Sequence, residues 1–389
     1  MKQINDEFEK IMRRKTVAQV LIAPIFIALL FGWLFSSNQI YNSPITVMDL
    51  DNSMYSRQLI DKLDASPYVN VARVMNEPVE PALILMHDST FAVVVLPDGL
   101  EENRYRGKST NIGFVVNDSV AAAVGNLRQG VAEVLASENA SLLMSKLVGM
   151  GLSSEQAQGL ASGLSVQQRS LYNPTSATVN TTVIGFVNLI ILALFIRQTT
   201  QILPHLREEG RFEDDIKSPL PLFCRLIPHV LLFFVSMLFV LGLLKQFGGL
   251  RFGGSVFALS APLFLYLLAS GFFAMLLSWN VKDPKKTLPR LAAVVGPSFF
   301  FSNILLPVAF MPKLIQIIAM AFPLNWYTKC YQAIALRGAK IAVLGQETGA
   351  LMILTAAYLL VMILLITVEI KGHTSTPGLL RKSAILRRT

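Results

Sequence analysis

The chain has 389 residues, of which 53% are hydrophobic and only 15% are charged. Soluble domains carry about 25% charged residues, so this composition excludes an ordinary soluble protein and indicates long segments that meet lipid. The net charge of +9 would suggest nucleic-acid binding in a soluble protein, but membrane proteins become basic by keeping lysine and arginine on the cytoplasmic side, so we expect no nucleic-acid partner.

The N-terminal segment, residues 1–15, has an amphipathic pattern. Its apolar side chains lie near one face of a helix, with charged residues between them: Ile4, Phe8, Ile11 and Met12. A helix of this kind lies in the membrane interface, where it contacts anionic lipid. A plain charged leader is the alternative. The apolar run that follows is long and lacks a small-residue cleavage pattern, so we expect no cleavable signal peptide.

Six apolar segments are long enough to cross a hydrocarbon core of roughly 30 Å, which needs about 20 residues. They are residues 16–35, 179–196, 226–244, 256–279, 291–308 and 350–370. Lysine and arginine gather before the first segment, in the second-to-third and fourth-to-fifth connections, and in a basic tail at residues 371–389. With six spans these regions share one side, so the positive-inside rule predicts that both termini are cytoplasmic.

The segment between the first two spans, residues 36–177, has the length of an ordinary domain. Apolar runs predict strands at residues 45–50, 69–74, 91–96 and 112–116, and helices at residues 54–63, 78–86, 120–147 and 153–170. This alternation predicts a small α/β domain outside the cytoplasm. The expected fold class is therefore an α-helical membrane protein with six transmembrane helices and an inserted extracytoplasmic α/β domain, the other five helices lying within residues 178–370.

No pattern for catalysis, cofactor binding or metal binding is evident. The four histidines are scattered, and the two cysteines, Cys224 and Cys330, lie in different parts of the chain. Residues 107–109 have the ending of a phosphate-binding loop, but Glu102 stands where that motif needs glycine, so we interpret them as a surface turn. We expect no enzyme activity, no catalytic residue, no cofactor and no metal; any ATP that drives this protein must be bound by another chain.

Acidic residues crowd the stretch between the second and third spans. Here the chain resembles the permease family of type-2 ATP-binding-cassette (ABC-2) exporters, which carries an Arg-Glu-x-x-Gly-Thr-x-Glu run and then Thr-Pro-Leu. The matching residues are Arg207, Glu208, Gly210, Glu213, Ser218, Pro219 and Leu220. The spacing from Glu208 to Gly210 is one residue shorter than in the family, Arg211 replaces a threonine, and Asp215 stands where an apolar residue is common.

This resemblance implies that residues 205–220 form a short coupling helix that sits in a cleft of a separate ATPase subunit. Acidic residues on a short helix, with Pro219 ending it, suit a rigid charged contact that chooses its partner by charge. The alternative is an ordinary solvated loop.

Two further regions resemble the same family. Residues 49–53 and the helix after them, with residues 94–97, resemble the outer domain of its drug-export branch. Residues 300–327 resemble its fifth span and outer re-entrant hairpin, through Ser302, Pro307, Met311, Pro312, Pro323 and Trp326. Because Pro312 and Pro323 bracket a stretch too short to span twice, we expect an outer re-entrant hairpin at residues 309–340.

Polar side chains within spans are candidates for lining a substrate path. Asn188 lies in the second span, and Ser302 and Asn303 lie in the fifth, where the family often has glycine in place of Asn303. Hydrogen bonding between helices is the alternative role. No acidic or basic residue lies clearly in mid-span, which disfavours an ion-coupled carrier.

The predicted function is the transmembrane permease subunit of an ABC exporter in a bacterial inner membrane. It would move an amphipathic drug or lipid outward with ATP hydrolysed by a separate subunit. Its expected partners are that ATPase subunit, a second permease copy or paralogue, a periplasmic adaptor and membrane lipid. The alternatives are a membrane-anchored receptor or scaffold with a ligand-binding outer domain, and an ion-coupled secondary transporter.

Overall fold

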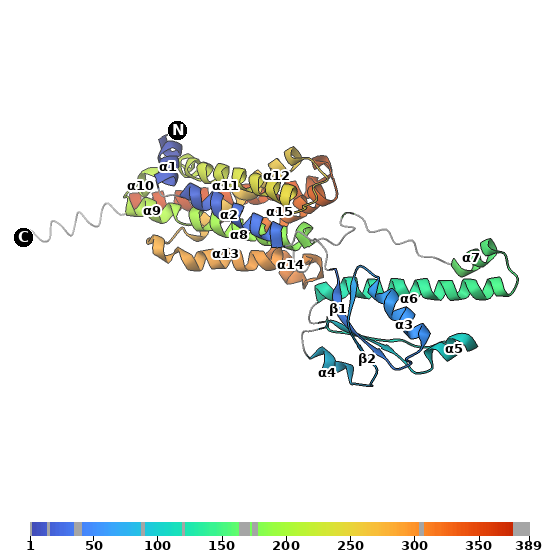
Figure 1. Ribbon diagram of the computed structural model, residues 1–389. Coiled ribbons are helices and arrows are strands. Elements are labelled where there is room, and N and C mark those ends of the chain that lie inside the picture. The colour runs from blue at the N-terminus through green and yellow to red at the C-terminus, as the bar shows by residue number, and fades with distance from the viewer. Residues whose placement is uncertain are drawn as a thin grey trace, which may run out of the picture. The chain divides into compact units, whose positions relative to one another are not determined.

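The computed structural model divides the chain into two compact units, each with its own apolar core (Figure 1). The first, the bundle, comprises Met1–Asn38 and Ser170–Thr389, and the second, the sheet unit, is Gln39–Arg169. The structure describes residues 2–13, 16–34, 41–86, 90–118, 121–162, 172, 178–302 and 307–375.

The described part of the bundle consists of helices joined by short connections. The helices are α1 (Lys2–Arg13), α2 (Thr16–Leu34), α8 (Thr182–Thr199), α9 (Ile202–Glu208), α10 (Phe212–Asp215), α11 (Pro219–Phe247), α12 (Val256–Leu277), α13 (Leu288–Phe301), α14 (Lys313–Met320), α15 (Pro323–Tyr331) and α16 (Gly345–Ser375). Short 3₁₀ turns occur at Thr178–Asn180, Pro284–Thr287, Val308–Phe310 and Ile341–Val343, and a π-helical turn, Gln332–Leu336, continues α15. The core lies where α2, α8, α11, α12, α15 and α16 pack together.

Close packing in this core depends on small residues at particular places. A Cβ atom added to Gly271 of α12 would come within 2.5 Å of Leu226 Cδ1 on α11. A larger residue at this position would therefore require the buried Leu226 side chain to move.

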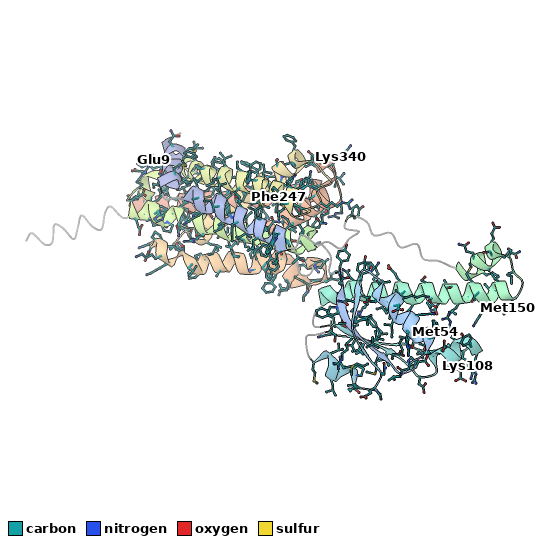
Figure 2. The ribbon with its side chains drawn as sticks, in the orientation of Figure 1. Glu9, Met54, Lys108, Met150, Phe247 and Lys340 are labelled. Carbon is teal, nitrogen blue, oxygen red and sulfur yellow. The ribbon has the colours of Figure 1, made fainter. Side chains whose placement is uncertain are left out.

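Five helices in the described residues are long and apolar enough to cross a membrane: α2, α8 continuing into α9, α11, α12 and α16. Their outer surfaces carry large apolar side chains, such as Phe26 and Trp33 on α2, and Phe247 at the end of α11 is 63% exposed (Figure 2). Exposed apolar area on this scale needs an apolar surrounding. The chain is accordingly an α-helical, multi-pass membrane protein, as its composition predicted.

The fifth predicted span, residues 291–308, corresponds to α13 and differs from the other five. This helix has 14 described residues, which at 1.5 Å per residue reach about 21 Å. It is shorter than the roughly 30 Å of a hydrocarbon core. The count of six spans therefore stays a prediction.

The boundaries of two helices correct the sequence analysis. Pro219 is the first residue of α11, so it begins the third span and does not end the short helix before it. The physical reason is that the first helical position needs no N–H donor, because that group has no partner within the helix. Proline has no N–H, and its fixed φ suits this position. At the other end of the chain, α16 continues to Ser375, so the predicted tail begins as helix.

The sheet unit contains one four-stranded sheet in the order β2-β1-β3-β4. Its strands are β1 (Ser43–Asp49), β2 (Val69–Met75), β3 (Ala92–Leu96) and β4 (Gly113–Val116). The first three are parallel, and β4 runs antiparallel to β3. The ends of these strands lie within one or two residues of the predicted ends. The prediction succeeds because short apolar runs rich in β-branched residues indicate buried strands.

Helices cover both faces of the sheet, unequally (Figure 1). One face packs against α3 (Met54–Asp64), α5 (Leu100–Arg106) and α6 (Ala121–Gly149), through residues such as Val47, Val94 and Leu127. The five-residue helix α4 (Pro81–Leu85) covers part of the other face. A last helix, α7 (Ser154–Ser162), packs on α6; the remainder of its predicted range lies outside the described residues.

Helix α5 is absent from the sequence analysis, because its start depends on a residue far away in the chain. The amides of Leu100 and Glu101 donate to the two carboxylate oxygens of Asp51, at 2.9 and 3.1 Å. Asp49 in turn accepts hydrogen bonds from the Asn52 amide and the Ser56 hydroxyl. The acidic loop after β1 therefore caps one helix and orients another, which is a structural role.

Candidate functional site

The stretch that resembles a coupling helix forms two short helices with a sharp turn between them. We call residues 202–218, which comprise α9, the turn and α10, the elbow. At the turn, Gly210 has a φ of +67°, a backbone conformation that glycine adopts without strain. The amides of Gly210 and Arg211 donate to Arg207 O and Leu206 O, at 3.1 and 2.9 Å. This double hydrogen bond is the Schellman ending of a helix, and it fixes the angle of the elbow.

Apolar and aromatic contacts hold the inner side of the elbow against the bundle. Phe212 is buried, and its ring packs edge-on against Trp279 at 5.9 Å. The guanidinium of Arg207 lies over the Phe212 ring at 3.9 Å and donates to Val281 O at 3.0 Å. Arg207 thus points toward the bundle and joins the elbow to the connection that follows α12.

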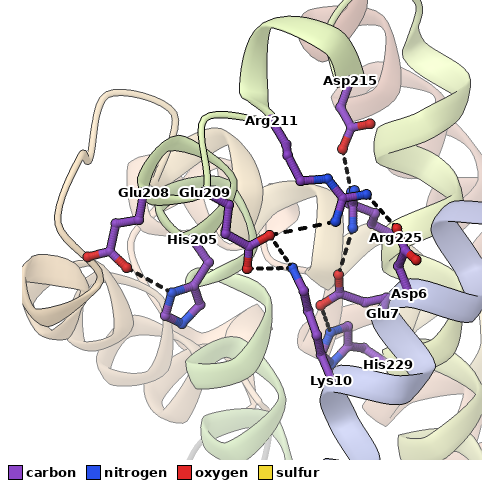
Figure 3. A network of polar contacts seen from close by, with 10 residues as sticks. All are labelled: Asp6, Glu7, Lys10, His205, Glu208, Glu209, Arg211, Asp215, Arg225 and His229. Carbon is purple, nitrogen blue, oxygen red and sulfur yellow. Dashed lines mark hydrogen bonds and ion pairs between the residues drawn. The ribbon is translucent and has the colours of Figure 1, made fainter.

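A buried charge network joins the elbow to α1 and α11 (Figure 3). Arg225 of α11 is fully buried, and its Nε donates to Asp215 Oδ2 of the elbow at 2.5 Å. Its Nη1 donates to Glu7 Oε2 of α1 at 3.1 Å. His229, one turn further along α11, places Nε2 at 3.3 Å from Glu7 Oε1. One arginine therefore holds carboxylates from two other helices.

A second, more exposed layer of charges joins α1 to the elbow (Figure 3). Lys10 of α1 donates to both carboxylate oxygens of Glu209, at 2.6 and 2.7 Å. Arg211 donates to Asp6 and lies 3.7 Å from Glu209. Because these pairs are partly solvated, each contributes little to stability by itself. Together they fix where α1 lies against the elbow.

The buried network keeps Glu7 ionised. Burial by itself would raise the pKa of the Glu7 carboxyl. The hydrogen bond with His229 and the positive charges of His229, Lys10 and Arg225 outweigh burial and hold that pKa below its usual value.

The outer surface of the elbow is acidic. The exposed residues from the sequence prediction are Glu208, Gly210, Glu213 and Ser218, and Glu209 and Asp214 are exposed beside them. Glu208 lies 3.3 Å from His205, and Asp214 accepts from Lys217 at 2.7 Å. The structure therefore brings the predicted residues together on one segment, except that Arg207 turns inward and Pro219 belongs to α11.

The predicted path-lining residues have different surroundings. Asn188 of α8 is buried, and its Oδ1 has no hydrogen-bond partner among the described residues. Ser302 is buried, and its hydroxyl donates to Phe299 O at 2.7 Å within its own helix. Asn303 lies outside the described residues. Asn188 is thus the candidate with unused hydrogen-bonding capacity.

The predicted re-entrant hairpin corresponds to α14 and α15, which have 8 and 9 residues. Pro312 immediately precedes α14, and Pro323 is the first residue of α15. The indole of Trp326 donates to Met320 O at 2.9 Å and the side-chain amide of Asn325 donates to Ala319 O at 3.3 Å, which closes the turn between the helices. In the bundle, α14 lies at the opposite end from α1, α9 and α10 (Figure 1).

Sequence reasoning missed two sets of residues. The first is the buried network around Glu7 and Arg225. The second is a tyrosine cluster between α12 and α15, where the rings of Tyr266 and Tyr327 stack at 4.6 Å and Tyr331 lies beside them. All three hydroxyls are buried without a hydrogen-bond partner among the described residues. The only sequence signal was the four-residue spacing of Tyr327 and Tyr331, which places both on one helix face.

The fold is that of a multi-pass helical membrane protein with a charged, partly exposed segment between two of its long helices. The family model described as ABC-2 family transporter protein matches residues 14–365, so the chain belongs to this family. It is the membrane subunit of an ABC transporter, and membership implies an ATPase subunit as its partner. No curated protein matches the chain. In the described residues no cluster of histidine, cysteine and acidic side chains could hold a metal ion.

Replacing Arg225 with methionine should destabilise the bundle, because Glu7 and Asp215 would stay buried without a counter-charge. Removing one partner of a buried pair lowers the free energy of unfolding by about 3–5 kcal/mol. The matched control is Lys217→Met, which removes an exposed partner of Asp214 and should leave the melting temperature of the purified chain unchanged. An Arg225→Met variant that melts with the wild type would contradict a structural role for the network.

Glu7→Gln should change how stability depends on pH. The folded-state pKa of Glu7 is below the ordinary value of 4.5, so the stabilisation from its charge is complete above that pH and is lost as the pH falls through the lowered pKa. The melting temperature of the wild type should exceed that of Glu7→Gln by a constant amount near neutral pH. This difference should shrink at pH values below 4.5; a difference that grows there would contradict the prediction.

Two tyrosine-to-phenylalanine substitutions should differ in their effect on stability, because one removes a hydroxyl without a partner and the other removes a hydrogen-bonded hydroxyl. Tyr327→Phe removes a buried hydroxyl without a partner and should leave the free energy of unfolding unchanged or raised. Tyr358→Phe removes a hydroxyl that donates to Ala321 O and should lower it by about 1 kcal/mol. Thermal melts of both variants test this. If Tyr327→Phe is the less stable of the two, its hydroxyl has a partner in the folded protein.

Proposed function

We propose that this permease is the membrane subunit of an ATP-driven exporter in a bacterial inner membrane, and that it moves an amphipathic drug or lipid outward. The observation that carries this proposal is the construction of the elbow. Its acidic side chains are exposed, while its inner side is fixed to α1 and α11 through buried Arg225. Exposed charge on a rigid base is what a contact with a moving ATPase needs, because it can both select a partner and transmit a displacement.

The proposed coupling runs from the elbow to two helices at once. A push by the ATPase on Glu208 and Glu213 would move α10, whose Asp215 is bonded to Arg225 of α11. The same arginine holds Glu7, so α1 would move with them. We expect α11 to carry the displacement toward the far end of the bundle, where α14 and α15 would open an exit. ATP itself would be bound only by the partner subunit.

The proposed orientation places the elbow and both termini in the cytoplasm and the sheet unit and the α14–α15 hairpin outside. The lysine and arginine distribution supports this orientation, as does the location of α1, α9 and α10 at one end of the bundle and α14 at the other. The proposal keeps the six spans of the sequence analysis, in which α13 belongs to the fifth, residues 291–308.

Three further partners belong to the proposal. Phe8 and Met12 are exposed on α1, which suits contact with membrane lipid at the interface. A second permease copy or paralogue would enclose the path, to which Asn188, Ser302 and Asn303 are the candidate contributors. A periplasmic adaptor would bind the sheet unit.

Charge reversal on the elbow tests the coupling. The double variant Glu208→Lys Glu213→Lys changes only exposed side chains, so the bundle should keep its wild-type melting temperature. Like-charge contacts with the ATPase should weaken the complex about tenfold or more. Copurification of the ATPase and substrate-stimulated ATP hydrolysis should both fall by at least that factor.

The matched control is Glu155→Lys, which reverses an exposed charge on α7 in the sheet unit and should leave both measurements unchanged. Wild-type copurification, hydrolysis and export in the double variant would reject the elbow as the ATPase contact. A receptor or an ion-coupled carrier would show no ATP hydrolysis that depends on these residues.

A further inference from the structure

The face of the sheet that α4 covers contains a cavity. Because α4 has only five residues, it leaves a space of about 440 Å³ between itself and strands β1 and β2. Cavities between about 300 and 1,000 Å³ are the usual size of small-molecule sites. This cavity lies within the sheet unit, on the opposite face of the sheet from α3, α5 and α6.

Two buried hydroxyls in the cavity lining have no partner among the residues that the structure describes. Thr46 is 1% exposed and Thr90 is 4% exposed, and neither Oγ1 has a hydrogen-bond partner within that part of the chain. An unpaired buried hydroxyl is unfavourable, so native structures satisfy nearly all of them. Thr46 lies in a strand, where it has no carbonyl of a preceding helical turn to which it could donate. A molecule in the cavity would supply the missing acceptor.

A positive charge lies beside these hydroxyls. Arg73 of β2 is the register partner of Thr46 of β1, so both side chains belong to the same face of the sheet. Arg73 also lines the cavity, and its guanidinium has no hydrogen bond or ion pair within the described residues. No acidic residue is among the described residues that line the cavity. A guanidinium with nearby hydroxyls is a donor set for a carboxylate or phosphate group.

The rest of the lining is apolar. Met75 lines the cavity from β2, Leu83 and Ile84 line it from α4, and Val79 lines it from the loop before α4. Leu83 is 54% exposed, so part of this apolar wall is open. The cavity thus combines a cationic, hydroxyl-bearing part with a hydrocarbon part.

We propose that this cavity binds a single-chain amphipathic anion, a molecule with one acyl or alkyl chain and a carboxylate or phosphate head group. Arg73 and the hydroxyls of Thr46 and Thr90 bind the head group, and the side chains of α4 cover the chain. The proposal does not rest on export or on an ATPase partner, because every residue it uses lies in the sheet unit.

The test is photolabelling of the full-length chain in nanodiscs of zwitterionic lipid with a diazirine-bearing dodecanoate. The label should map to peptides that carry α4 and β2, and unlabelled dodecanoate should compete with it. Arg73→Gln should weaken binding about tenfold or more, since it removes a charge-assisted hydrogen bond. The control Arg57→Gln removes an exposed arginine from α3 on the opposite face and should bind as the wild type does.

A second variant separates binding from folding. Thr46→Val keeps the shape of the side chain and removes the unpaired hydroxyl, so it should melt at or above the wild-type temperature and yet bind dodecanoate more weakly. Equal binding by Arg73→Gln and the wild type, labelling that maps elsewhere, or equal competition by uncharged dodecanol would each overturn the proposal.

Competition with two anions identifies the source of the natural ligand. Stronger competition by dodecanoate supports a free fatty acid, and stronger competition by a lysophosphatidate supports a lipid with a phosphate head group. Failure of both anions to compete would overturn the proposal. Because ATP hydrolysis is not measured here, the outcome is independent of the coupling experiment on the elbow.

Discussion

The pairing of the buried Arg225 guanidinium with two carboxylates joins three helices at the elbow end of the bundle. A fully buried cation is unfavourable unless carboxylates surround it with good hydrogen-bond geometry. Asp215 and Glu7 provide these carboxylates from α10 and α1, respectively. Both helices have further contacts, since Phe212 of α10 packs against Trp279 and Lys10 of α1 bonds to Glu209, but Arg225 bonds to both of them from α11. The need to neutralise this buried charge is therefore one of the constraints that position the elbow.

Charges at this end of the bundle have two different roles, which depend on burial. The buried pairs of Arg225 fix geometry, because moving either carboxylate would leave the arginine uncompensated. Glu208 and Glu213 are exposed, so their interactions are screened and contribute little to stability. They are free to interact with a partner protein. The same segment therefore has a fixed inner side and exposed charges outside, and the proposed coupling contact would use both properties.

Much of the fold could be predicted from local patterns. The five long apolar helices and the four strands lie close to their predicted positions, because their signals, apolar runs and turn residues, are contained in short windows. The sequence analysis also named Glu208, Gly210 and Glu213 through a resemblance, and their role in coupling stays a prediction. Helix α5 could not be predicted, because Asp51, which caps it, is 49 residues away from Leu100 in the chain. The number of spans also stays a prediction, because the 14 residues of α13 are too short to cross a membrane by themselves.

The sequence by itself determined that this is an α-helical membrane protein and located its strands and the acidic segment between two long helices, because composition and periodicity are local properties. Tertiary structure decided which of its charges are buried. Glu7 and Arg225 are 218 residues apart, and nothing near either residue indicates that they pair. Likewise, the cavity lined by Thr46 and Arg73 exists only because β1 and β2 are neighbours in register. Burial and long-range pairing depend on where distant segments meet, and that is set by packing.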